Sequence, residues 1–275
     1  MFQKIIRNDP QNPVLITIPH SGNLYPDIFL EQIKLDLRKI RKIEDFKSDE
    51  IVKFFNEDAA DILIAKCSRA VLDLNRSRKA LDNNMFEEII LHSDPDEKQM
   101  LSYGLGVLPK LIQNESIFKS KLPTYYGKHI LETFYDPFHL SIKTQIEALL
   151  SKFGVCYHFD LHSMPQSSVK NMKKIPDIVL GDNYQKSCSV ELIDYIKDQF
   201  EKYGLRVSIN KPYAGGFITR NYGNPSEGKE TMQIEVNRSL YMDEDKLLLR
   251  NIELIQKIFS EIFNFFSYNH KIAAE

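Results

Sequence analysis

Several residues capable of metal binding or acid–base chemistry follow or lie within short apolar runs of this sequence. His20 comes after VLITIP, Asp160 and His162 lie in FDLHSMP (159–165), and Glu235 lies in MQIEV (232–236). Neutral imidazoles and carboxylates are the side chains that ligate divalent metals and transfer protons in catalysis. These residues could therefore meet in one site, or each could be a structural residue with local partners.

Each residue has a structural explanation when it is taken singly. A lone histidine at a strand end is more often structural than a ligand, and Glu235 could form an ion pair with Arg238 or Arg76. His158 shares a strand face with Asp160, where it could support a site or be buried against a helix. Clustering two imidazoles, a carboxylate and an arginine at one sheet edge costs desolvation that folding does not require, which favours a functional site.

The elements that would position these residues alternate along the chain. Apolar, β-branched runs predict strands at 14–18, 61–65, 70–74, 155–159, 177–181, 205–209 and 232–236. Apolar residues at helical spacing predict helices within 27–40, 49–60, 125–152, 187–203 and 244–268. The alternation predicts an α/β fold with helices on both faces of the sheet. In such sheets, ligands bind beyond the carboxyl ends of the strands.

Length and composition predict one compact domain over residues 1–275, because 43% of the residues are hydrophobic. Residues 77–124 are expected to form an irregular insertion or lid, and 215–230 a second mobile loop, because neither keeps a regular period. The net charge of −2 argues against nucleic acid or a membrane surface and favours a small-molecule partner. Three scattered cysteines and no long apolar run predict a cytoplasmic protein. Oligomeric state is left open.

A set of ordered motifs over roughly residues 13–245 resembles the N-formylglutamate amidohydrolase family. The motifs are PHSG (19–22), CSRAVLDLNR (67–76), GLGVLPK (104–110), FDLHSMP (159–165), PDIVLGD (176–182), NKPYAGGFITRNYG (210–223) and MQIEVNRSLYMDE (232–244). That family is similar to carboxypeptidase-like zinc hydrolases and aspartoacylases. The resemblance therefore implies a mixed, largely parallel sheet and one bound Zn²⁺.

The resemblance implies metal ligands at His20 and His162. The zinc-hydrolase relatives place their acidic ligand three residues after the first histidine, where this sequence has Asn23. The carboxylate is therefore expected from SDEIVKFF (48–55), with Asp49 as the first choice and Asp45 in reserve. The alternative for Asp49 is ordinary capping of a helix N-terminus.

The resemblance also implies roles in catalysis and substrate binding. Glu235 would be the general base, and Arg69 would stabilise the oxyanion. Further residues are expected to contact the substrate: Asn75 and Arg76 its carboxylate, Arg220 a second carboxylate, and Tyr213 the pocket wall. Asp160 would orient a ligating imidazole.

The activity implied is zinc-dependent hydrolysis of an N-acyl amino acid, with N-formyl-L-glutamate giving formate and L-glutamate. Alternatives are another N-acyl amino acid or a peptide end, and a metal-binding or carboxylate-binding module without catalysis. A serine hydrolase is disfavoured because neither Ser21 nor Ser163 lies in a GxSxG elbow. The histidines outside these motifs are expected at surfaces or in local hydrogen bonds: His92, His129, His139 and His270.

Overall fold

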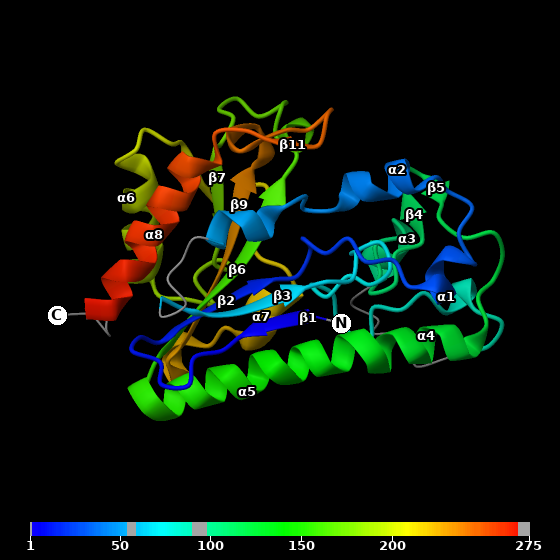
Figure 1. Cartoon of the computed structure of the whole chain (residues 1–275), viewed down its shortest axis with the longest axis horizontal. Coiled ribbons are helices and arrows are strands. Elements are labelled where there is room, and N and C mark those ends of the chain that lie inside the picture. Colours follow the sequence, from blue (N-terminus) through cyan, green and yellow to red (C-terminus); the bar gives the residue numbers. More distant parts are fainter. Residues whose placement is uncertain (1, 54–58, 90–97, 269–275) are drawn as a thin grey trace. The chain divides into compact units, whose positions relative to one another are not determined.

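The computed structural model of the chain describes residues 2–53, 59–89 and 98–268 (Figure 1). The chain forms two compact units. Unit 1 comprises Met1–Gln3, Pro19–Phe46 and Ile64–Ser141, and unit 2 comprises Lys4–Ile18, Lys47–Leu63 and Ile142–Glu275. Each unit is therefore assembled from segments that are distant in the sequence.

A seven-stranded sheet with the order β1-β3-β2-β6-β9-β7-β8 is the main element of the fold. Its strands are β1 Phe2–Ile5, β2 Val14–Ile18, β3 Asp61–Ala65, β6 Cys156–Met164, β7 Ile178–Gly181, β8 Val207–Ile209 and β9 Lys229–Asn237. The pairs β2–β6, β6–β9 and β7–β8 are parallel, whereas β7 is antiparallel to β9. The sheet is therefore mixed and largely parallel.

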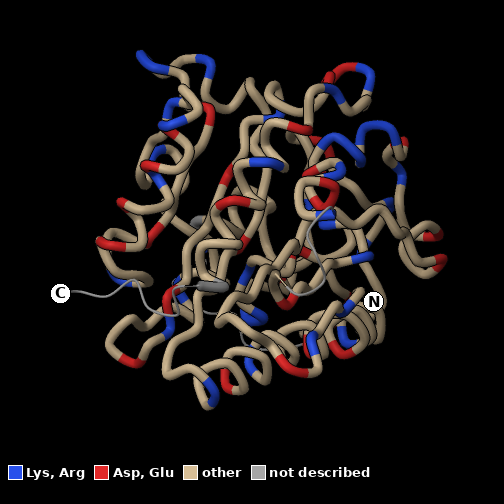
Figure 2. Tube along the Cα trace, turned by 60° about the vertical axis from the view of Figure 1, so that its left-hand side comes forward, with Lys and Arg blue, Asp and Glu red and all other residues tan. Residues whose placement is uncertain are grey.

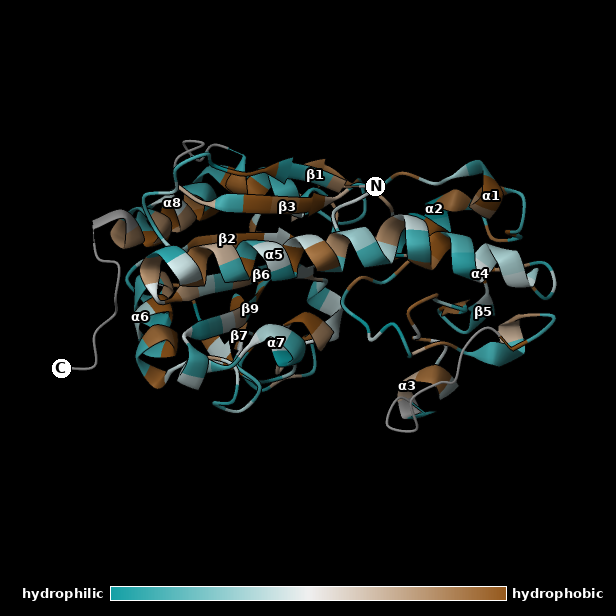
Figure 3. Ribbon diagram, turned by 90° about the horizontal axis from the view of Figure 1, so that it is seen from below, coloured by the Kyte–Doolittle hydropathy of each residue, from teal (hydrophilic) through white to brown (hydrophobic). Residues whose placement is uncertain are grey.

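The central strands are buried on both faces, as expected in a parallel sheet covered by helices. All five residues of β2 and all nine residues of β6 are buried. Figure 3 shows largely hydrophobic colouring along β2. Since β6 also carries His158, Asp160 and His162, the polar groups of that strand lie inside the protein rather than at its surface.

Helices of unit 2 cover both faces of β6. On one face, Tyr157 and Phe159 pack against α8 (Ile252–Tyr268), with 4.6 Å between the ring centroids of Tyr157 and Phe266. Helix α6 (Val190–Glu201) lies beside α8 (Figure 1). On the other face, Tyr222 of α7 (Phe217–Tyr222) lies 6.2 Å from the ring of His158. The predicted α/β fold with helices on both faces is confirmed.

A close backbone approach in unit 1 fixes the chain just after His20. Leu24 donates a backbone hydrogen bond to Lys66 (2.9 Å), and Ser68 donates one to Leu24 (3.0 Å). At Gly22 a Cβ atom would lie 2.4 Å from the carbonyl oxygen of Cys67, so only glycine fits there. The chain from Gly22 to Leu24, just after His20, is thereby held against residues 66–68.

Unit 1 is otherwise built from short elements. They include α1 Asp27–Leu30, α2 Leu37–Ile40, the 3₁₀ turns η1 Arg41–Ile43 and η3 Asn83–Met85, α3 Lys98–Ser102, and the β4–β5 hairpin of Leu111–Ile112 and Glu115–Ser116. A longer helical stretch follows: α4 Thr124–Ile130, a π-helical turn η5 Leu131–Tyr135, and α5 Asp136–Phe153, which continues into unit 2. Unit 2 further holds the 3₁₀ turns η2 Ser48–Val52, η6 Gln166–Ser168, η7 Pro225–Glu227 and η8 Arg238–Leu240, and the pair β10 Met242–Asp243 and β11 Leu248–Leu249.

Six of the seven predicted strands and the helices within 125–152 and 187–203 are confirmed. The strand predicted at 70–74 is wrong, because Val71 and Leu72 both donate to the carbonyl of Ser68 and the chain turns there. The helix expected at 27–40 is two separate helices, and the one expected at 244–268 begins at 252. Of the helix expected at 49–60, residues 54–58 lie outside the described residues, and the part before them is the 3₁₀ turn η2.

The two segments predicted to be irregular differ in outcome. Across 77–124 the described residues hold only short elements, while 90–97, with His92, lie outside the described part, as does His270. Residues 215–230 contain α7, so this segment is not simply a loop. Acidic and basic residues are interspersed along the described trace (Figure 2). Among the described helices, none has the length and apolar character needed to span a bilayer.

Candidate active site

His20 lies two residues after β2 and is held by a buried carboxylate. Its Nε2 lies 2.6 Å from Oδ1 of Asp73, and both side chains are buried. Because an ionised carboxylate can only accept a hydrogen bond, Nε2 carries the proton. In the neutral imidazole, the lone pair is then on Nδ1.

Asp73 is surrounded by positive charge. Arg69 donates to its Oδ2 at 2.9 Å, and Nε of Arg76 lies 3.8 Å from the same oxygen. Burial alone would raise the pKa of the Asp73 carboxyl, but His20, Arg69 and Arg76 outweigh that effect and hold the pKa well below its usual value. Asp73 therefore remains a carboxylate that can fix the orientation of His20.

Asp45 lies on the other side of the His20 ring. Its backbone N–H donates to the carbonyl of His20 at 3.0 Å, which ties the two stretches together. Its Oδ2 lies 3.6 Å from Nδ1 of His20, which is longer than a hydrogen bond. Its other oxygen lies 3.5 Å from Nη1 of Arg69. The Nδ1 atom and the carboxylate thus face each other with more separation than a direct hydrogen bond would give.

His162 is held in the same manner as His20. On β6, its Nε2 lies 2.9 Å from Oδ2 of Asp160, so this nitrogen is again the protonated one. Asp160 also accepts from the hydroxyl of Thr17 at 2.7 Å, and that hydroxyl lies 3.0 Å from Nε2 of His158. Burial raises the pKa of Asp160, but His162, His158 and Thr17 together lower it below its ordinary value. Burial lowers the pKa of His158 to about 4.

Glu235 lies on β9, directly opposite His162 in the parallel register of β6 and β9. It is buried and accepts a hydrogen bond from Nε2 of Gln233 at 2.8 Å. Oε1 of Gln233 in turn accepts from the backbone N–H of Gly216 at 2.7 Å. This second bond determines which end of the amide faces Glu235, so the donor side is directed at the carboxylate.

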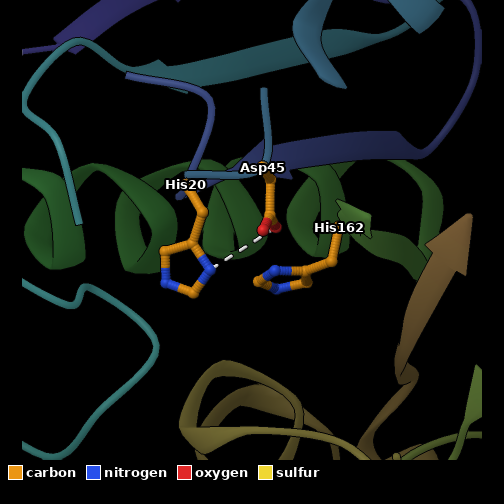
Figure 4. Close-up of side chains that lie close together, drawn as sticks. All are labelled: His20, Asp45 and His162. Atoms are coloured by element: carbon orange, nitrogen blue, oxygen red, sulfur yellow. Dashed lines mark ion pairs between the residues drawn. The ribbon is translucent and has the colours of Figure 1, made fainter. Parts of the chain in front are cut away.

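His20, Asp45 and His162 form a group of potential metal ligands. All three are buried, and each offers one ligand atom within 4.8 Å of the atoms offered by the other two. Figure 4 shows the three side chains turned toward one another. Two imidazoles and one carboxylate form a donor set typical of a catalytic zinc site that keeps a further coordination position open. The residues present therefore fit a divalent metal ion.

The residues of this group and Glu235 all lie within a segment that matches a known protein family. A family model described as N-formylglutamate amidohydrolase matches residues 12–242. The chain belongs to the N-formylglutamate amidohydrolase family. The resemblance stated from the sequence motifs is thereby confirmed.

Individual members of the N-formylglutamate amidohydrolase family agree with this assignment. The N-formylglutamate deformylase of Pseudomonas putida is 27% identical over 252 residues, which cover 89% of this chain and 87% of the relative. That of Pseudomonas aeruginosa is 26% identical, over 84% of this chain and 83% of its own. The crystal structure of N-formylglutamate amidohydrolase from Ralstonia eutropha JMP134 is 25% identical, with a TM-score of 0.89, and covers 97% of this chain and 98% of its own.

The structure brings together only some of the site residues predicted from the family resemblance. The potential ligand group contains Asp45, the reserve choice, and does not include Asp49, which lies in the first turn of η2. Arg69 and Asn75 join the Asp73 cluster, Asn75 through its backbone N–H (3.0 Å).

Two of the residues predicted to contact substrate, Arg220 and Tyr213, lie within the segment 210–223. Arg220 is exposed on α7 and donates to the carbonyl of Gly215 at 3.0 Å. Tyr213 packs against the buried cluster of Met164, Val169 and Val179. Both positions belong to the family motif NKPYAGGFITRNYG, and neither belongs to the ligand group.

Sequence reasoning did not identify Asp73 or Gln233 as site residues. Asp73 lies inside the motif LDLNR, in which only the neighbouring asparagine and arginine were predicted to bind substrate. Gln233 lies two residues before Glu235, and this period-2 spacing on a strand was the available signal that the two share a face. Each of the two side chains makes a hydrogen bond to a residue that was predicted, Asp73 to His20 and Gln233 to Glu235.

Proposed function

We propose that this member of the N-formylglutamate amidohydrolase family is a metal-dependent hydrolase that cleaves N-formyl-L-glutamate to formate and L-glutamate. The observation that carries the proposal is the buried group of His20, Asp45 and His162, whose ligand atoms lie within 4.8 Å of one another. The names of the Pseudomonas relatives, N-formylglutamate deformylases, support the choice of substrate.

Zinc is the ion we propose for this group. Asp73 and Asp160 hold the Nε2 atoms of the two histidines, which leaves Nδ1 of each as the ligating nitrogen, and Asp45 supplies a carboxylate oxygen. Zinc accepts such nitrogen and oxygen ligands. When bound, the ion would polarise the amide carbonyl and activate a water molecule for attack.

Glu235 is proposed as the general base. Its carboxylate, held by Gln233, would take a proton from the attacking water and deliver it to the leaving nitrogen of glutamate. His162 faces the same side of the sheet from the neighbouring strand, because residues paired in a parallel ladder point to the same face. The base therefore lies beside one of the proposed ligands.

Arginines would supply the positive charge that the substrate needs. Arg69, paired with Asp73 and Asp45, would stabilise the negative charge that develops on the carbonyl oxygen. Asn75 and Arg76 would bind the α-carboxylate, since a guanidinium group can make two parallel hydrogen bonds to it. Arg220 would meet the side-chain carboxylate, with Tyr213 lining the pocket.

The test is a combined metal and substrate assay on the purified protein. We expect about one equivalent of zinc and release of formate from N-formyl-L-glutamate. Release of formate from N-formyl-L-glutamine and of acetate from N-acetyl-L-glutamate should be slower. Removal of the metal by a chelator should abolish turnover, and zinc should restore it. His20→Ala and His162→Ala should lose both metal and activity, whereas His129→Ala, on the exposed face of α4, should keep both.

Two outcomes would contradict the proposal. Equal turnover of all three substrates would reject the specific assignment in favour of a broader N-acyl amino acid hydrolase. Metal binding without any turnover would instead indicate a binding module without catalysis.

A further inference from the structure

The turn that carries Arg76 is bound at three alternate residues by one stretch of helix. His139 donates from Nε2 to the carbonyl of Leu74 at 3.0 Å, and the hydroxyl of Tyr135 donates to the carbonyl of Arg76 at 2.8 Å. Two residues further, Arg78 forms a two-bond ion pair with Asp136, at 2.7 and 3.0 Å. All of these contacts lie within unit 1.

The helix is irregular where it makes these contacts. Leu131–Tyr135 form a π-helical turn between α4 and α5, and such turns occur frequently at functional sites. The rings of Tyr135 and His139 lie with 4.1 Å between their centroids and a tilt of 30° between their planes. Each ring therefore restricts the other while its polar atom reaches a backbone carbonyl of the turn.

The side chain of Arg76 is less constrained than its backbone. Its Nε lies 3.8 Å from Oδ2 of Asp73, and this buried Nε makes no hydrogen bond to any residue that the structure describes. A buried donor without a hydrogen bond is costly, and a bound anion would satisfy it. The placement of the guanidinium group thus depends on where the backbone of the turn is held.

We propose that Tyr135 is a positioning residue for substrate binding: through the carbonyl of Arg76, and with His139 beside it, Tyr135 holds the guanidinium group where it receives the substrate α-carboxylate. This inference rests on the proposed function, which assigns that carboxylate to Arg76. Tyr135 acts through the backbone of Arg76 and does not itself contact the substrate.

Tyr135→Phe tests the inference, because it removes one hydroxyl and keeps the ring. We expect KM for N-formyl-L-glutamate to rise about three- to tenfold, the effect of one hydrogen bond, while kcat changes less than about twofold. Tyr126→Phe is the matched control: Tyr126 is a fully buried tyrosine of α4 whose hydroxyl makes no hydrogen bond to the described residues. The control should leave both constants within about twofold of wild type.

A second substrate separates positioning of the guanidinium group from a general loss of structure. In N-formylglutamic acid α-amide the α-carboxylate is replaced, so the ratio of kcat/KM between wild type and Tyr135→Phe should fall toward one. An equal loss on both substrates would overturn the inference, as would a Tyr135→Phe enzyme that matches Tyr126→Phe. His139→Leu, compared with His129→Leu, gives the same test if Tyr135→Phe does not fold.

Different results would reject the hydrolase function and the positioning role of Tyr135. If the wild-type, zinc-loaded protein releases no formate, the proposed function fails and the inference falls with it. If the wild type is active and both the Tyr135 and His139 variants keep its KM, only the positioning role is rejected.

Discussion

Glu235 and His162 lie directly opposite each other on adjacent parallel strands, β9 and β6. Both residues are buried, and each is held by a polar neighbour two positions before it, Gln233 for Glu235 and Asp160 for His162. The same spacing on two paired strands creates two rows of polar residues on one face of the sheet.

Asp45 and Asp49 offer a direct comparison between the observed and the expected carboxylate. Asp45→Asn should weaken zinc binding by more than the roughly 10- to 100-fold typical of residues that only support a ligand. Asp49→Asn should leave zinc affinity within about threefold of wild type, since Asp49 is not in the ligand group. Competition with a zinc-binding dye measures both. The assignment of Asp45 would be wrong if the two variants ranked in the opposite order.

Glu235→Gln should lower kcat by about 10²- to 10⁴-fold, because the amide cannot accept a proton from water. Zinc content should stay near one equivalent, since Glu235 is not among the proposed ligands. Glu227→Gln, at an exposed glutamate of η7, is the control and should retain full activity. Steady-state kinetics and metal analysis of the same preparations check this, and near-normal turnover of Glu235→Gln would remove the residue from the mechanism.

Gln233→Met keeps the size of the side chain but removes its hydrogen bonds to Glu235 and to Gly216. We expect kcat to fall by about 10-fold or more, with a smaller change in KM, because the carboxylate loses its orientation. Thr231→Val is the matched control on the same strand, since the buried hydroxyl of Thr231 bonds to no described residue. Equal kinetics of the two variants would show that the Gln233 amide is not needed.

His158 makes stability depend on pH. Its pKa is about 4 in the folded protein because of burial, and about 6.5 when exposed, so the unfolded chain binds the extra proton between these values. The stabilisation is therefore complete above about pH 6.5 and is lost as the pH falls toward 4. This term should lower the free energy of unfolding by roughly 2 kcal/mol between pH 7 and pH 5. Urea unfolding of wild type and His158→Gln checks it, and parallel pH curves for the two proteins would exclude His158 as the cause.

The central sheet was predictable because its strands are short, apolar and β-branched, and six of the seven predicted segments are strands. The run AVLDL (70–74) is similarly apolar but forms a turn, because Ser68 accepts two backbone hydrogen bonds there. Its residues are buried without joining the sheet. A short apolar run does not reveal whether it is buried in a ladder or in a turn.

Only part of the candidate site was predictable, for a related physical reason. His20 and His162 follow or lie in strands, where the motifs mark them. Asp45 lies in a segment without a regular period, and its place is set by a backbone hydrogen bond to His20, which is far from it in the sequence. Such a contact between distant segments leaves no local pattern. The strand carrying His162 was also longer than predicted, because its polar residues interrupt the apolar run while remaining buried.

The π-helical turn has a consequence for how the enzyme could be altered. The residues proposed for proton transfer and for one metal ligand lie on sheet strands. Arg76 instead lies on a turn whose backbone is bound by Tyr135 and His139, and whose Arg78 side chain pairs with Asp136. The residue proposed to bind the α-carboxylate and the proposed base, Glu235, are therefore carried by different elements of the chain. A redesign of the enzyme for a new amino acid substrate can therefore begin with Tyr135 and His139 on the helix and leave β6 and β9 unchanged.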